Sequence, residues 1–214
     1  TSVSCNGGAD GSITAYNVIG GTGSVSYSIN SVNYQSGNVF TGLTAGTYTV
    51  YVRDVAACVA THTISITQPT AIVATATTTN ATCFESYTGS ITVNATGGTP
   101  GYIYSIDNEY FQESNSFSEL EAGTYSVVVR DDNGCQYTFS VTITQPTQIS
   151  ASITAGSSTC GNSNGTLLAV ATGGSGSGYT YSIDGTNFIS SGSFTGLLSG
   201  TYNIVIRDGA GCQN

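Results

Sequence analysis

The stretch Gly-Thr-Tyr-Ser-Val-Val-Val-Arg-Asp at residues 123–131 indicates the fold of this chain, because it occurs three times in closely similar form. It stands as Gly-Thr-Tyr-Thr-Val-Tyr-Val-Arg-Asp at residues 46–54 and as Gly-Thr-Tyr-Asn-Ile-Val-Ile-Arg-Asp at residues 200–208. Apolar side chains alternate within it, as in a half-buried β-strand. Its tyrosine is either a tyrosine corner or an ordinary inward-facing aromatic residue. The spacing of 77 residues predicts three copies of one unit.

The middle copy shows the pattern of a complete unit. Alternating apolar residues recur at residues 89–95, 102–106 and 137–143, with glycine-rich turns between them. Together with the quoted stretch, a strand near residues 71–75 and one between Asp107 and Gly123, they predict six short antiparallel strands. This pattern is typical of an immunoglobulin-like β-sandwich. Pro146 marks its end, because proline has no N–H to offer a sheet.

The period places the copies at residues 1–69, 70–146 and 147–214, and we expect one β-sandwich domain in each. By this alignment copy 1 lacks most of its first strand and copy 3 lacks its last strand. We therefore expect the chain to be an excerpt from a longer array. Copy 3 should expose an unpaired edge beside three side chains of its tyrosine strand, Tyr202, Ile204 and Ile206. The next stretch of the same chain, or a strand from another subunit, is expected to fill that groove.

The charge balance excludes several functions. Lysine plus arginine number 3 against 12 acidic residues, which gives a formal net charge of -9. All three basic residues are arginines, so neither nucleic-acid binding nor lysine chemistry is expected. No run of apolar residues is long enough to span a membrane in this segment. Disorder is excluded because 39% of the residues are hydrophobic and they alternate regularly with polar residues.

Each copy contains two cysteines, which indicates one disulfide per copy in an oxidising compartment. If four strands cross the sandwich between the two, both cysteines lie at the same end and can meet. We therefore expect the pairs Cys5–Cys58, Cys83–Cys135 and Cys160–Cys212. Buried free thiols are the alternative.

No residue pattern points to catalysis or to a cofactor. The single histidine, His62, stands at the position of Phe139 in copy 2, and we expect it to be a partly buried packing residue. A weak candidate for a calcium site is the run Asp131, Asp132 and Asn133, because oxygen ligands suit a hard cation. The other copies have no full acidic counterpart of this run.

Several motifs recur in the same order in the copies. They are Gly-Ser-Ile (11–13, 89–91), Tyr-Ser-Ile-Asp (104–107, 181–184), Phe-Thr-Gly-Leu (40–43, 194–197) and Val-Arg-Asp (52–54, 129–131), followed by Thr-Ile-Thr-Gln-Pro (142–146), which stands as Ser-Ile-Thr-Gln-Pro in copy 1 (65–69). This order resembles the SprB repeat of the giant cell-surface adhesins of Bacteroidota. The resemblance implies an extracellular protein that the type IX secretion system exports. It also implies tandem repeats in a long surface filament, and some members of the family serve gliding motility.

Two kinds of function follow from these observations. The first is a rigid stalk in an adhesin filament, whose partners are the neighbouring repeats of the same chain. The second is an array of binding modules, in which exposed tyrosines such as Tyr51, Tyr87 and Tyr110 contact glycans or another extracellular surface.

Overall fold

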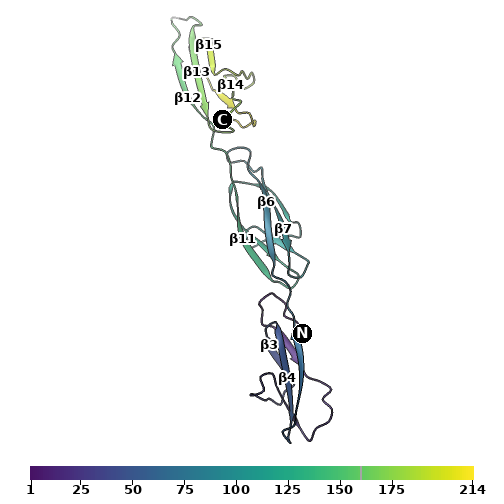
Figure 1. Ribbon diagram of the computed structural model, residues 1–214. Coiled ribbons are helices and arrows are strands. Elements are labelled where there is room, and N and C mark those ends of the chain that lie inside the picture. The colour runs from purple at the N-terminus through teal and green to yellow at the C-terminus, as the bar shows by residue number, and fades with distance from the viewer. Residues whose placement is uncertain (160) are drawn as a thin grey trace. The chain divides into compact units, whose positions relative to one another are not determined.

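The computed structural model describes residues 1–159 and 161–214. These residues contain sixteen β-strands and no helix, and the strands pair in an antiparallel manner. Figure 1 shows labelled strands in all three copies, from β3 and β4 in purple to β14 and β15 in yellow-green. The predicted all-β class is confirmed.

The described chain divides into two compact units, and the division runs through copy 2. Unit 1 comprises Thr1–Thr75, Asn94–Glu113 and Val127–Phe139. Unit 2 comprises Ala76–Val93, Ser114–Ser126 and Ser140–Asn214. Each unit therefore contains one junction between consecutive copies, and each is described by itself below.

Copy 1 lies entirely in unit 1 and has two sheets. Its strands are β1 (Gly11–Thr14), β2 (Val25–Ser28), β3 (Val39–Leu43), β4 (Gly46–Asp54) and β5 (Val59–Ile66). One sheet pairs β1 with β3, and the other has the order β2-β4-β5. Side chains from both sheets form the core: Val3, Ile13, Leu43, Val50 and Ile66. This is the two-layer arrangement of a β-sandwich.

Copy 2 has the six strands that the sequence predicts. They are β6 (Val73–Thr79), β7 (Gly89–Thr96), β8 (Ile103–Ser105), β9 (Ser116–Leu120), β10 (Gly123–Arg130) and β11 (Gln136–Ile143). The sheet orders are β6-β7-β9 and β11-β10-β8. The side chains of Ile91, Val93, Val127, Val129 and Ile143 are no more than 1% exposed. Inward-facing apolar residues of alternating strands therefore build the core.

Copy 3 lies in unit 2 and has five strands among the described residues. They are β12 (Ser150–Gly156), β13 (Gly165–Thr172), β14 (Thr180–Ser182), β15 (Ser193–Leu197) and β16 (Val205–Arg207). Buried and exposed residues alternate along the whole of β13. The strand that corresponds to the quoted Gly-Thr-Tyr stretch is short in copy 3. It comprises only β16, which pairs with β14, and residues 201–204 belong to no strand. The predicted edge of copy 3 is open beside Tyr202 and Ile204, whereas the backbone of Ile206 exchanges two hydrogen bonds with Asn214.

The tyrosine of each quoted stretch is a tyrosine corner. Its hydroxyl donates to the backbone carbonyl four residues upstream, at 3.0 Å from Tyr48, 2.9 Å from Tyr125 and 3.0 Å from Tyr202. This bond ties the strand to the preceding turn in all three copies.

Candidate functional site: the cysteine junctions

The aspartate that ends each quoted stretch organises the loop of the second cysteine. In copy 2, Asp131 accepts the backbone N–H of Cys135 on Oδ1 and that of Thr99 on Oδ2, both at 2.8 Å. Asp54 in copy 1 and Asp208 in copy 3 accept the equivalent pairs of N–H groups, at 2.7 to 2.9 Å. The backbone of the second cysteine is therefore fixed in the same way in every copy.

These contacts make the aspartate more acidic in copy 1. The backbone N–H of Thr22, followed by that of Cys58, holds the pKa of Asp54 below its usual range. Hydrogen bonds to the charged form have this effect because they stabilise the carboxylate and not the acid. The loop is thus held by a charged group at neutral pH.

The same loop contains the candidate calcium ligands. The Oδ1 of Asp131 also accepts the N–H of Asn133, and the Asn133 side-chain amide donates to Ser4 O at 3.1 Å and to Thr99 Oγ1 at 2.9 Å. Asp131 and Asn133 therefore have a structural role in the loop. The described residues contain no group of three or more His, Cys, Asp or Glu placed to hold a metal ion. A calcium site at Asp131, Asp132 and Asn133 stays a prediction.

The loop of the first cysteine is held at the end of the last strand of its copy. In copy 1, Gln68 Oε1 accepts the backbone N–H of Gly7 at 2.8 Å. In copy 2, Gln145 Oε1 accepts the N–H of Glu85 at 2.7 Å. Both glutamines belong to the segment Thr-Gln-Pro-Thr, which occurs at residues 67–70 and again at residues 144–147. Its recurrence at the same place was the signal for this role.

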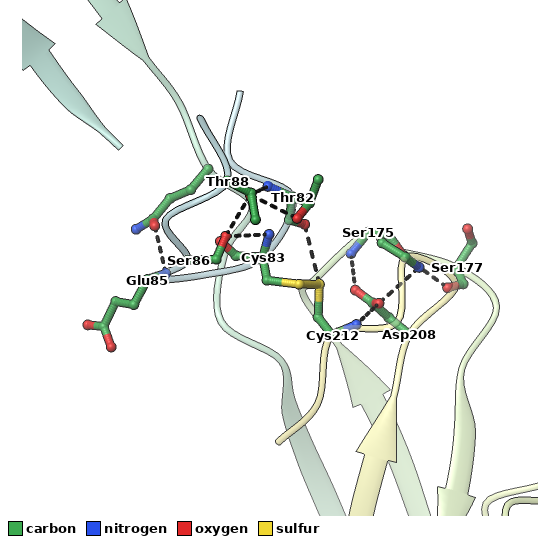
Figure 2. The surroundings of a disulfide bond; sticks show 11 residues. Thr82, Cys83, Glu85, Ser86, Thr88, Ser175, Ser177, Asp208 and Cys212 are labelled. Atoms are coloured by element: carbon green, nitrogen blue, oxygen red, sulfur yellow. Dashed lines mark hydrogen bonds between the residues drawn. A yellow bond between two sulfur atoms is a disulfide. The ribbon is translucent and has the colours of Figure 1, made fainter. Parts of the chain in front are cut away.

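Disulfides join consecutive copies. Cys5 is bonded to Cys135 in unit 1, and Cys83 is bonded to Cys212 in unit 2, with Cα–Cα distances of 5.6 and 5.5 Å. Figure 2 shows the second bond, between the loop held by Asp208 and the turn of Thr82 and Ser86. The predicted pairing within each copy is therefore wrong. In both observed bonds, the first cysteine of one copy is instead joined to the second cysteine of the next copy.

The error lies in the number of strand crossings. In copy 1, β2 pairs only with the far half of β4, from Asp54 to Tyr51, whereas β3 pairs with β1 in the other sheet. The two short strands thus share one crossing of the sandwich, so three strands cross between the cysteines and not four. Cys5 and Cys58 consequently lie at opposite ends of β5. Its eight residues measure about 26 Å, far beyond the reach of a disulfide.

Cys58 has no disulfide partner among the described residues, and it is exposed. Its counterparts Cys135 and Cys212 are half-buried and 7% exposed, respectively. The prediction that Cys58 forms a disulfide within copy 1 is therefore wrong. Cys160, which was expected to bond Cys212, lies outside the described residues, and Cys212 is bonded elsewhere.

The expected packing role of His62 is also wrong, because this side chain is exposed. It lies on β5 opposite Val50. The sheet that faces β5 has only the strands β1 and β3. Over His62 these strands leave a groove of about 470 Å³, whose other walls include Ile13, Val18, Ile19 and Val52.

The tyrosines proposed as ligand contacts differ in exposure. Tyr87 and Tyr110 are 64% and 78% exposed, whereas Tyr51 is half-buried. A hydrogen bond to Glu121 and the charge of that carboxylate raise the pKa of Tyr87. Tyr87 and Glu121 line a hollow of about 370 Å³ in unit 2. This pair offers a flat ring beside a hydrogen-bond acceptor.

Comparison with known protein families gives a match to one repeat family. The model of the SprB repeat matches residues 1–33 and 75–109. These two segments are similar to the SprB repeat. The matched segments contain the first cysteine of copies 1 and 2, and together they make up about a third of the chain. No match is found among curated proteins. None of the described residues forms a helix that is long and apolar enough to cross a membrane.

Two solved structures that are similar to this chain consist of immunoglobulin domains. The N-terminal eight domains of Down syndrome cell adhesion molecule isoform 1.30.30 match at 11% identity and a TM-score of 0.38, over 89% of this chain and 31% of that one. Immunoglobulin domains 1–5 of Sidekick-1 match at 15% identity and a TM-score of 0.29, over 79% and 42%. The chain thus spans less than half the length of either structure.

Proposed function

We propose that this region is a non-catalytic stalk segment of a large secreted adhesin at the bacterial cell surface. The SprB-type repeats support this proposal, and so do disulfides, which persist in oxidising extracellular surroundings. Three tandem domains at residues 1–69, 70–146 and 147–214, export by the type IX secretion system and a part in gliding motility belong to the same proposal. The partners are the neighbouring repeats of the chain, and no cofactor is required.

The observation that carries the proposal is the double link at each junction. Residues 67–70 connect copies 1 and 2 through the backbone, and the bond Cys5–Cys135 connects them a second time. Residues 144–147 and the bond Cys83–Cys212 do the same for copies 2 and 3. A second covalent attachment restricts the rotations that a single short linker allows. Such junctions suit a stalk that must bear load and hold its direction.

Pulling single molecules by their two ends tests this role. With both disulfides closed, the shortest covalent path from Thr1 to Asn214 runs through Cys5, Cys135, Cys83 and Cys212. Fully extended, this path measures on the order of 200 Å, against roughly 750 Å for the whole backbone.

We expect oxidised molecules to stop extending near the shorter length and reduced molecules to reach the longer one. A chain with Cys5→Ser and Cys83→Ser is the matched control, and it should extend like the reduced protein. Oxidised molecules that extend to full length at moderate force would exclude a load-bearing role of the junctions. The stalk proposal also expects no saturable binding to a glycan array.

The second candidate function is a binding module, and the hollow beside Tyr87 and Glu121 favours it. Aromatic rings next to carboxylates suit the apolar faces and hydroxyls of sugars. Saturable binding on a glycan array that Tyr87→Ala abolishes, with Tyr110→Ala as the control, would support this function. In that case the stalk would also be a receptor.

A further inference from the structure

Copy 1 differs from copies 2 and 3 at the end that holds its second cysteine. In copies 2 and 3, a cysteine loop from the preceding copy covers this end and bonds the second cysteine. In copy 1 the equivalent Cys58 is exposed and has no partner among the described residues. Val55 and Val59 on either side of it are 66% and 51% exposed.

The loop around Cys58 is nevertheless built like the two bonded loops. The Asp54 carboxylate accepts the Cys58 N–H at 2.8 Å, as Asp131 does for Cys135. The N–H of Ala57 bonds the carbonyl of Asp54 at 3.1 Å, as that of Gly134 bonds the carbonyl of Asp131 at 2.9 Å. The bonded conformation of the loop is thus already present before any partner arrives.

Among the described residues, the strand beside this loop, β1, also has no partner strand on its outer edge, where only Thr1 exchanges backbone hydrogen bonds with Ser12. In copy 3, β12 pairs with β13 from Ser150↔Thr172 to Gly156↔Thr166, and in copy 2, β6 is the neighbour of β7. Both β7 and β13 are eight residues long, whereas the equivalent β1 has four. Three apolar residues that follow β1 are consequently exposed: Tyr16 at 76%, Val18 at 41% and Ile19 at 92%. Val18 and Ile19 line the groove over β5 described above.

We propose that this face of copy 1, formed by the Cys58 loop and the open edge of β1, is a covalent docking site for the cysteine-loop end of another SprB-type repeat. The equivalent cysteines of the two other copies are bonded to such an end, so the partner is identified by what occupies the same place twice in this chain. The incoming repeat supplies the first cysteine of its unit and the strand that follows its Thr-Gln-Pro-Thr segment. This inference rests on the junction geometry and holds whether or not the region serves as a stalk.

Bond formation needs an oxidant, and a low-molecular-weight disulfide such as oxidised glutathione is sufficient. The Cys58 thiolate attacks one sulfur of oxidised glutathione, forms a mixed disulfide and releases one reduced glutathione. The thiolate of the incoming cysteine then displaces the second glutathione. Two thiols thus become one disulfide, and the oxidised glutathione becomes two molecules of thiol.

A mixing experiment with two full-length variants tests the site. Cys160→Ser keeps Cys58, and Cys58→Ser keeps Cys160, which by the 77-residue period is the first cysteine of copy 3. Both variants retain the cysteines of the two observed disulfides, so non-reducing peptide mapping first verifies that these bonds are intact. Equal amounts are then mixed in a glutathione redox buffer and separated under non-reducing conditions.

We expect the mixed dimer, linked from Cys58 to Cys160, to exceed either homodimer by at least about tenfold. Random pairing gives the mixed dimer only about twice the amount of each homodimer. A random distribution, or capping of both cysteines by glutathione without dimers, would overturn the docking site.

A peptide in trans tests the strand edge separately. The peptide of residues 67–80 carries the linker and strand that occupy the equivalent edge of copy 2, and Ile72 and Ala74 within it are each 8% exposed there. We expect it to slow hydrogen exchange of residues 13–19 by at least about tenfold. The same peptide with Ile72→Asp and Ala74→Asp is the control. Equal exchange with both peptides would exclude β-strand addition at this edge.

Discussion

The tyrosine strands of copies 2 and 3 have almost the same sequence but different structures. In copy 2, β10 runs over eight residues, Gly123–Arg130, between β8 and β11. In copy 3, the equivalent segment is a strand only over Val205–Arg207, where β14 pairs with it. The segments share Gly-Thr-Tyr and Arg-Asp, so local sequence does not explain the difference. In copy 2, β11 pairs with this segment and completes the strand. The length of a strand in this protein therefore depends on the neighbouring strands as much as on its own residues.

Among the changes proposed here, removing one junction disulfide should alter the stability of copy 3 relative to copy 2 the most. We expect Cys83→Ser combined with Cys212→Ser to lower the free energy of unfolding of copy 3 by about 5 kcal/mol, because the bond closes a loop of 129 residues. Urea denaturation followed by hydrogen exchange measures the loss. Cys58→Ser is the control, since it leaves both disulfides in place. Equal stability of the two variants would contradict the observed pairing.

Supplying a partner strand should bring copy 3 closer to copy 2. In this variant, residues 136–146 of copy 2 replace Gln213 and Asn214 after Cys212. We expect residues 201–204 to join the strand and their amide exchange to slow by about a hundredfold. The same graft with Tyr137, Phe139 and Val141 changed to aspartate is the control. Unchanged exchange at residues 201–204 would mean that something other than a missing partner prevents this strand.

The 77-residue period and the alternating strands predicted the all-β fold, and the absence of a last strand predicted the open edge beside Tyr202. The disulfide pairing was not predictable in the same way. Nothing in residues 25–43 indicates that β2 and β3 pair with different sheets and share one crossing, and that single crossing reverses the end at which Cys58 lies.

The exposure of the His62 side chain in copy 1 was not predictable either, for a related reason. His62 has the inward parity of its strand, but parity gives only the side on which a residue lies and not whether anything covers it. The facing sheet has two strands in copy 1 and three in copy 2, and this difference opens the groove over β5. The role of Gln68 and Gln145 was visible in the sequence as a repeated motif.

A smaller effect concerns the turn before the second cysteine. Ala57 has a φ of 65°, a left-handed conformation that favours glycine, and its counterparts Gly134 and Gly211 have φ values of 81° and 89°. We expect Ala57→Gly to stabilise copy 1 by about 1 kcal/mol, because it relieves the crowding of the alanine Cβ. Gly134→Ala should destabilise copy 2 by a similar amount. Thermal unfolding of the two variants measures both changes in stability. Changes of the same sign would contradict the explanation.

The smallest effect is a local dependence on pH that distinguishes copy 3 from copy 1. Asp184 accepts the N–H groups of Asn187 at 2.8 Å and Thr186 at 2.9 Å in a tight turn. The N–H of Asn187 is the largest of several hydrogen bonds that together hold the pKa of Asp184 far below its usual range. In copy 1 an asparagine, Asn30, accepts the equivalent N–H groups and carries no charge to lose.

Because the folded pKa of Asp184 is depressed, the turn gains stability above the unfolded pKa of about 3.9 and loses it as pH falls through the folded value. We therefore expect the amide NMR signals of Thr186 and Asn187 to shift only when the pH falls well below 3.9. The signals of Val32 and Asn33 beside Asn30 should not follow that titration. In an Asp184→Asn variant, the copy 3 signals should become as independent of pH as those of copy 1. A midpoint near 3.9 in the unmodified chain would show instead that the turn does not stabilise the carboxylate, since an aspartate without these hydrogen bonds titrates there.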